Sequence, residues 1–231
     1  MGPAKSCCAV KKCRKLIWED NMYVKDRMVK DPVCIGPDTK ISDALNKMID
    51  FHRLPVVDDQ HHLLGLVSAG MIEESTATKT TSLSIYELNY LLHKMSVEEI
   101  MIRDVVTISP DALLEEAAVL MRKKNVGCLP VVDPEGKVIG IITHNDIFEA
   151  FIDLLGYYQK GARYVILVDE DKIGVLASIS ACLRDMGASI SNLAVYHTAR
   201  GIEVVVIASK TDCKEGLEKA GYNVTSVIER N

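Results

Sequence analysis

The sequence predicts a mixed α/β protein in which two copies of a small repeat precede a third unit of different pattern. The segment 31–38 recurs at 104–111, and Leu-Pro-Val-Val-Asp at 54–58 recurs at 129–133. The offsets between the copies are 73 and 75 residues. Self-similarity at a nearly fixed offset indicates a repeated structural unit. We expect the two copies to pack face to face, because neither can bury both sides of its small sheet alone.

The composition excludes several classes of protein. Of the 231 residues, 48% are hydrophobic and 26% are charged, which is typical of soluble globular chains. The net charge of -5 lacks the cationic surface that non-specific nucleic-acid binding needs, so no nucleic-acid partner is predicted. No apolar run approaches the ~18 residues that cross a bilayer, which predicts a cytoplasmic protein without a membrane partner. Seven cysteines without a Cys-x-x-Cys pair indicate reduced thiols.

Four segments divide the chain. Residues 1–21, with three cysteines and a basic stretch, are expected to be a poorly ordered leader, and a metal or lipid attachment point is the alternative. Residues 22–100 form the first copy with an inserted helix, and residues 101–160 form the second copy. Residues 163–231 form the third unit.

Within each copy, a short strand and a Pro-Asp turn precede a helix, a strand, a hairpin, a second strand and a closing helix. The apolar spacing of the first helix predicts one buried face, which consists of Ile41, Leu45, Met48 and Ile49. The matching face in the second copy consists of Leu114, Ala118 and Met121. Between the copies, Ser84 and Glu87 form a capping box that starts a helix, and a second cap follows at 96–99.

The third unit has the strand and helix order βαββαβ, which is the ferredoxin-like split. Gly174 opens its first helix and Gly187 ends it. The expected strands are 164–168, 190–196, 204–208 and 224–228, with a second helix over 211–220.

The repeated Leu-Pro-Val-Val-Asp strand, followed by Gly-hydrophobic-x-Ser/Thr at 65–68 and 140–143, resembles the tandem cystathionine-beta-synthase (CBS) domain pair, or Bateman module. The third unit resembles an ACT domain over 169–193, although Ile173 stands where that family often has Pro. Together they resemble bacterial regulatory proteins of the acetoin-utilisation B type. The resemblance implies a ligand-sensing regulatory protein that binds an adenine nucleotide, AMP, ADP or ATP, or another adenosyl compound.

The second copy carries the candidate nucleotide site. Thr143, His144 and Asp146 bring a hydroxyl, backbone N–H groups and a carboxylate to a helix N-terminus. Such a terminus suits a phosphate, and a carboxylate suits the two hydroxyls of a ribose. The CBS resemblance implies that Asp146 takes the ribose and that Thr143 lies near the phosphate. It also implies that the adenine is lined by Val105, Val106 and Thr107. The alternative is that Thr143 and Asp146 only cap the helix.

The first copy differs from the second at two places. Met71 stands where the acid should be, so we expect one nucleotide per pair. His52 and Arg53 precede Leu-Pro, at the position of phosphate-contacting basic pairs in some nucleotide-sensing CBS proteins. The alternative for this pair is a solvated basic pair at a helix end.

The ACT resemblance implies an amino-acid site at the turn before the first helix of the third unit, in that family between two subunits. Gly174 would let backbone N–H groups approach a carboxylate. The candidate residues are Asp171, Ile173, Gly174 and Val175. The alternative is a plain turn in a module used only for dimerisation.

No motif in the sequence supports catalysis. It has no nucleophile triad, no Gly-rich phosphate loop and no paired acids in a predicted pocket, so the protein is not predicted to be an enzyme. His61 and His62 are interpreted as solvated loop residues, which leaves no predicted metal site and no obligatory cofactor. The predicted function is a homodimeric regulator of an unidentified partner enzyme, and a ligand-free assembly adaptor is the alternative.

Overall fold

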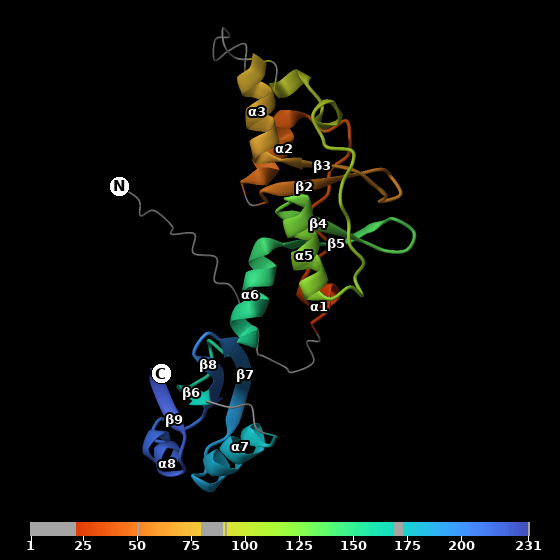
Figure 1. Ribbon diagram of the computed structural model, residues 1–231. Coiled ribbons are helices and arrows are strands. Elements are labelled where there is room, and N and C mark those ends of the chain that lie inside the picture. Colours follow the sequence, from red (N-terminus) through yellow and green to blue (C-terminus); the bar gives the residue numbers. More distant parts are fainter. Residues whose placement is uncertain (1–21, 50, 80–89, 91, 169–172, 231) are drawn as a thin grey trace, which may run out of the picture. The chain divides into compact units, whose positions relative to one another are not determined.

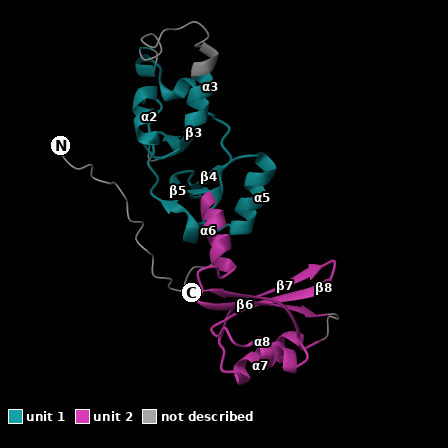
Figure 2. Cartoon of the chain, turned by 90° about the vertical axis from the view of Figure 1, so that its left-hand side faces the viewer, with its two compact units in different colours: residues 1–144 teal, residues 145–231 magenta. Residues whose placement is uncertain are grey.

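The computed structural model describes residues 22–49, 51–79, 90, 92–168 and 173–230. The chain divides into two compact units, residues 1–144 and 145–231, which are coloured separately in Figure 2. The expected leader, and the helix start expected at Ser84 and Glu87, lie outside the described residues.

The first copy contains the predicted helix, hairpin and closing helix (Figure 1). These elements are α2 (Ile41–Met48), β2 (Arg53–Val57), β3 (Leu63–Ser68) and α3 (Ala69–Lys79). Strands β2 and β3 are antiparallel, with Leu54 opposite Val67. Ile41 and Met48 are buried as expected, but Ile49 is 78% exposed. The expectation for Ile49 is wrong because the buried face consists of Ile41, Ala44 and Met48, and a helix turns by about 100° per residue, so Ile49 points away from that face.

The second copy repeats this arrangement. Its elements are α5 (Leu114–Lys124), β4 (Cys128–Val132), β5 (Val138–Thr143) and α6 (His144–Leu154). Leu129 lies opposite Ile142, which is the same register as in the first copy. Asn125 ends α5 in the left-handed conformation, with φ 53°. Both hairpins therefore have the same register, although the second copy has two more residues before its Leu-Pro.

The aspartate that ends each Val-Val strand closes the hairpin. Oδ1 of Asp58 accepts hydrogen bonds from the backbone N–H groups of Gln60 and His62, at 2.9 and 2.8 Å. Asp133 Oδ1 accepts the equivalent bonds from Glu135 and Lys137, at 3.0 and 2.8 Å. The His62 backbone N–H makes the largest contribution to lowering the pKa of the Asp58 carboxyl. The motif aspartate therefore has a structural role in both copies.

The two hairpins contact each other symmetrically. The N–H of Leu63 donates to the carbonyl of Gly136, at 3.3 Å, and the N–H of Val138 donates to that of His61, at 3.0 Å. Residues 61 and 136, like 63 and 138, are equivalent at the offset of 75. Exchanging the two copies therefore exchanges these two hydrogen bonds, as expected when a pseudo-two-fold axis relates the copies.

Each copy is completed by the segment that precedes the other copy. These two arms are residues 22–31, containing α1 (Val24–Arg27) and β1 (Val29–Lys30), and residues 95–104, containing the 3-10 helix η1 (Val97–Glu99). The first arm pairs with the second copy, where Val29 lies opposite Ile141. The second arm pairs with the first copy, where Ile102 and Leu66 exchange backbone hydrogen bonds of 2.9 and 3.0 Å.

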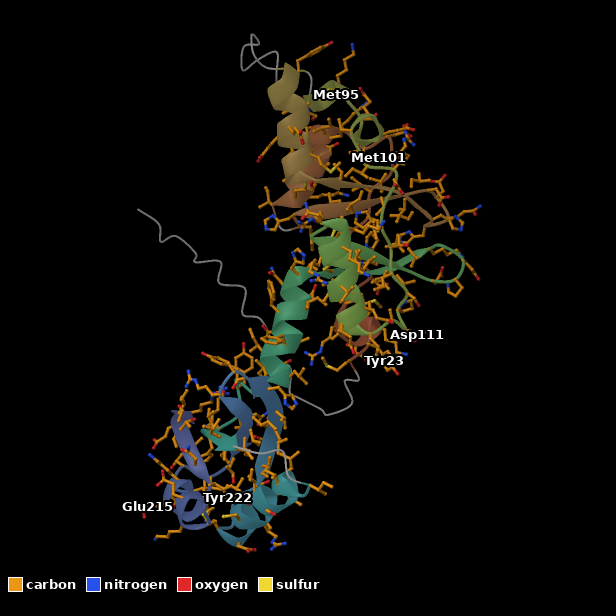
Figure 3. The ribbon with its side chains drawn as sticks, viewed as in Figure 1. Tyr23, Met95, Met101, Asp111, Glu215 and Tyr222 are labelled. Atoms are coloured by element: carbon orange, nitrogen blue, oxygen red, sulfur yellow. The ribbon has the colours of Figure 1, made fainter. Side chains whose placement is uncertain are left out.

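The same exchange extends to the start of each arm. The N–H of Val24 donates to the carbonyl of Ala112, and that of Val97 donates to Thr39, both at 2.8 Å. Val24 and Val97 are both fully buried. The backbone N–H of Ser96 donates to Glu99 Oε1 at 2.9 Å, so the predicted cap at 96–99 is confirmed, on a 3-10 helix. In Figure 3, Met95 and Met101 mark the second arm, Tyr23 marks the first arm, and Asp111 marks the part of the second copy that the first arm contacts.

The third unit has the expected βαββαβ order. Its elements are β6 (Gly161–Val168), α7 (Val175–Asp185), β7 (Ile190–Thr198), β8 (Gly201–Ala208), α8 (Lys214–Lys219) and β9 (Asn223–Arg230). The strands form an antiparallel sheet in the order β7-β8-β6-β9. Helices α7 and α8 cover one face of this sheet (Figure 2). Its core includes Tyr164, Ile166, Ile179, Leu183, Val206 and Leu217.

Tyr164 provides a buried polar anchor in that core. Its side chain is fully buried, and its hydroxyl donates to the Lys210 carbonyl at 2.7 Å and accepts from the Cys213 N–H at 3.0 Å. Burial raises the pKa of Tyr164 to about 12. The neutral hydroxyl therefore fixes the segment that leads into α8.

The two glycines that face the arms are expected to respond differently to substitution. A Cβ at Gly65 would lie 2.8 Å from the backbone oxygen of Ile102, whereas the nearest atoms to a Cβ at Gly140 all belong to the flexible Met28 side chain. We expect Gly65→Ala to destabilise the protein by about 1–3 kcal/mol and Gly140→Ala by less, because a side chain can move where a paired backbone cannot. Urea unfolding of both variants measures this difference. Equal losses would contradict the arm pairing at Ile102.

Candidate functional site

The predicted phosphate and ribose residues lie at one helix N-terminus. Strand β5 runs directly into α6, so Thr143 is the last residue of the strand and Asp146 lies in the first turn of the helix. Cys128, the first residue of β4, pairs with Thr143. The N–H of His144 donates to the carbonyl of Gly127 at 3.3 Å. The start of β4 therefore lies beside the start of α6.

The predicted adenine-lining residues lie along the other side of β4. Ile108 forms a parallel bridge with Val131, and its N–H donates to the Pro130 carbonyl at 3.1 Å. Because the bridge is parallel, residues 105–107 lead away from it towards the same end of β4 at which Cys128 pairs with Thr143. Val105, Val106 and Thr107 are half-buried. The sheet thus brings these residues and Thr143 to one end.

Arg53 reaches this end of the sheet from the first copy. A Cβ on Gly127 would overlap the Arg53 guanidinium, so the guanidinium lies directly against the Gly127 backbone. Burial raises the pKa of the Cys128 thiol, and the nearby Arg53 charge acts in the opposite direction. Among the described residues, the exposed His52 side chain makes no hydrogen bond or ion pair. The structure therefore brings Arg53 to the second copy, while the His52 side chain is exposed.

The first copy has the same junction between a strand and a helix, but without an acid at the start of the helix. At the start of α3, the backbone N–H of Met71 donates to Ser68 Oγ at 3.4 Å. Ser68 and Met71 are equivalent to Thr143 and Asp146. Because the first copy begins its helix with a hydroxyl and no carboxylate, the acid at position 146 is not a requirement of this turn.

Three of the candidate amino-acid residues of the third unit, Ile173, Gly174 and Val175, line a pocket. Gly174, with φ 91°, is the N-cap of α7, and its carbonyl accepts the N–H of Ser178 at 2.9 Å. The pocket has a volume of about 240 Å³, and its other lining residues are Val168, Leu176, Val195, Ile202 and Val204. All the lining residues are apolar or glycine, and Asp171 lies outside the described residues.

In the described part of the chain, no three His, Cys, Asp or Glu side chains gather in a way that could hold a metal ion. The Nδ1 atom of His62 lies 3.1 Å from Asp58 Oδ2, so this histidine belongs to the hairpin turn. No helix there has the length and apolar character that a membrane crossing demands.

Sequence reasoning did not identify Gly127 as part of the candidate site. Its importance is that it leaves room for a side chain from the other copy. The sequence holds a signal for this contact, since the small pair Gly127-Cys128 stands where the first copy has the bulky pair His52-Arg53. Small residues opposite large ones are what two packed, related surfaces require.

Known proteins resemble this chain over both copies of the repeat. The CBS domain family matches residues 24–73 and 97–153. A CBS domain-containing protein of Dictyostelium discoideum is 36% identical over 142 residues, which are 58% of this chain and 94% of that protein. A homoserine O-acetyltransferase of Methanohalobium evestigatum is 35% identical over 127 residues, 54% of this chain, but the match covers only 23% of that enzyme.

Among solved structures, the CBS domain pair of protein MJ0100, in complex with 5'-methylthioadenosine and S-adenosyl-L-methionine, is 30% identical. The match covers 56% of this chain and 94% of that one, with a TM-score of 0.48. The Dictyostelium relative is matched over nearly its whole length, and both family matches coincide with the two copies of the repeat. The chain therefore belongs to the family of CBS domain proteins and carries a tandem CBS pair.

Proposed function

We propose that this protein is a regulatory protein that senses an adenine nucleotide, or another adenosyl compound, through its CBS pair. The observation that carries the proposal is the position of Arg53. Its guanidinium crosses from the first copy to Gly127, whose carbonyl accepts the N–H of His144 at the start of α6. A cation from one copy and a helix N-terminus of the other thus converge on one place, which suits an anion.

The roles of the other residues follow from their chemistry. Thr143 supplies a hydroxyl near the phosphate, and Asp146 supplies acceptors for the ribose hydroxyls. The N–H of His144 is already used by Gly127, so the phosphate depends on Arg53 and on the N–H groups that follow. Val105, Val106 and Thr107 line the adenine. The absence of an acid at Met71 supports one nucleotide per pair.

Asp146→Ala should weaken nucleotide binding and Met71→Ala should not. The first substitution removes a charged acceptor whose hydrogen bonds are worth about 1.5–3 kcal/mol, which is about 10- to 100-fold in affinity. Calorimetric titration with AMP, ADP, ATP and S-adenosylmethionine measures the affinities. A ligand at a hundred times its Kd should also stabilise the fold by about 2.7 kcal/mol in a thermal-shift assay. If no compound binds at millimolar concentration, a ligand-free assembly adaptor becomes the better interpretation.

The Arg53 contact provides an independent test of where the phosphate lies. Arg53→Ala should weaken ATP and AMP about tenfold or more, but should change the affinity for adenosine little, because adenosine has no phosphate. Gly127→Ala should reproduce this selective loss, since its Cβ displaces only the flexible end of Arg53. Equal losses for adenosine and AMP would place the phosphate elsewhere.

We further propose that the third unit is an ACT domain through which the chain forms a homodimer. Strand β7 is an edge of its sheet, and Leu193, Val195 and Tyr196 are each 40% exposed on it. A long edge strand with apolar side chains readily pairs with another chain. The pocket beside Gly174, next to this edge, is the candidate place for an amino acid. In this proposal the protein acts in the cytoplasm on a partner enzyme.

Light scattering of the full chain should give a mass of at least twice 25.5 kDa at micromolar concentration. Val195→Lys should weaken this association, because it places a charge on the edge strand. Val119→Lys on α5 is a matched control, since Val119 is 41% exposed and Val195 is 40% exposed. A monomer, or equal effects of both variants, would contradict dimerisation through β7.

A further inference from the structure

The face of the four-stranded sheet opposite α7 and α8 is not bare. Side chains alternate between the two faces of a strand, so Arg163, Val165, Val205 and Ile207 point away from the core that contains Tyr164 and Val206. Val165, Val205 and Ile207 are nevertheless only 8%, 7% and 1% exposed. The end of α6 and the turn that follows it contribute to the cover, and these segments belong to the same compact unit as the sheet.

Polar side chains from both edges of the sheet hold this turn in place. Asn192 on β7 donates from Nδ2 to the Leu154 carbonyl at 2.8 Å. Arg230 on β9 donates to the Gly156 carbonyl at 2.5 Å, and its guanidinium lies 5.4 Å from the Tyr157 ring centroid. Gly156 has φ 63°, and a Cβ there would overlap Asn192. The turn can approach the sheet closely because this residue is glycine.

A pocket of about 160 Å³ remains between the turn and the sheet. Its lining is mostly apolar and includes the aromatic rings of Phe151, Tyr157 and Tyr196. The lining also contains Arg163, Arg230 and Asn192, but no acidic residue. An apolar cavity of about 150 Å³ is large enough to hold benzene. The pocket therefore has the size for a small ring and a positive charge at its wall.

Arg230 holds the turn against the sheet, but Arg163 makes no equivalent contact among the described residues. Arg163 is a half-buried residue, and within the described part of the chain its side chain makes no hydrogen bond or ion pair. A guanidinium pairs strongly with a carboxylate, because its N–H groups match the two carboxylate oxygens. A ligand that carries a carboxylate would pair Arg163 while its apolar body fills the pocket.

We propose that this pocket is a binding site for a small organic carboxylate with an aromatic or branched apolar body. The site is separate from the nucleotide residues and from the pocket beside Gly174, since it shares no lining residue with either. The carboxylate pairs with Arg163, and the apolar body lies between the sheet and the end of α6. Occupancy therefore strengthens the packing of α6 against the sheet.

The probe pair is phenylacetate and its neutral analogue benzyl alcohol, titrated into the ¹⁵N-labelled full chain. We expect phenylacetate to bind at millimolar concentration or below and to shift the amide signals of 154–157, 163 and 192–196. Benzyl alcohol should bind about tenfold more weakly or worse, because it lacks the charge that pairs with Arg163.

Arg163→Gln should weaken phenylacetate about tenfold or more while leaving benzyl alcohol unchanged. Arg200→Gln is the matched control, because Arg200 is exposed in the turn between β7 and β8 and does not line the pocket. Ala194→Phe, which fills the pocket, should abolish binding of both probes, and unchanged amide dispersion shows that the variant is folded. The proposal is overturned if phenylacetate shifts none of these signals at 10 mM, or if Arg163→Gln binds it as tightly as the parent chain.

Discussion

The structure of the CBS pair depends on the reciprocal backbone pairing of its two arms. Residues 22–31 complete the sheet of the second copy, and residues 95–104 complete that of the first. Without the exchange, strands β3 and β5 would each leave an edge of unpaired N–H and C=O groups. The same exchange, with the contact between the hairpins, fixes the two copies relative to each other. That placement puts the Arg53 guanidinium against Gly127, and so defines the candidate phosphate site.

Most elements of the fold could be predicted from the sequence because local chemistry specifies them. The hairpins follow from aspartates whose side chains bind backbone N–H groups two and four residues further on. The third unit was predictable from its alternating apolar strands and from Gly174 and Gly187, both of which have positive φ. The exposure of Ile49 was not predicted because apolar spacing alone does not show which of the two adjacent residues Met48 and Ile49 faces the core.

The arm exchange was not predicted, because its hydrogen bonds join backbone atoms and leave little trace in residue types. The repeat nevertheless extends into the arms, where Val24 and Met28 match Val97 and Met101 at the offset of 73. The candidate site likewise has one part that the sequence predicts and one part that it does not. Thr143 and Asp146 are neighbours in sequence, so their shared helix end was predictable. The position of Arg53 depends on how the two copies pack, which no single segment encodes.

The symmetry of the exchanged arms has a consequence for how such a chain could arise. A shorter polypeptide with one copy of the repeat would carry an arm that fits another molecule's sheet, and two such polypeptides would close into a two-fold dimer. Duplication and fusion of the gene would keep every contact and make the partner part of the same molecule. Assembly would then no longer depend on protein concentration, because the tether sets a high effective concentration. Once joined, the halves would be free to differ, as they do where Asp146 in one stands opposite Met71 in the other.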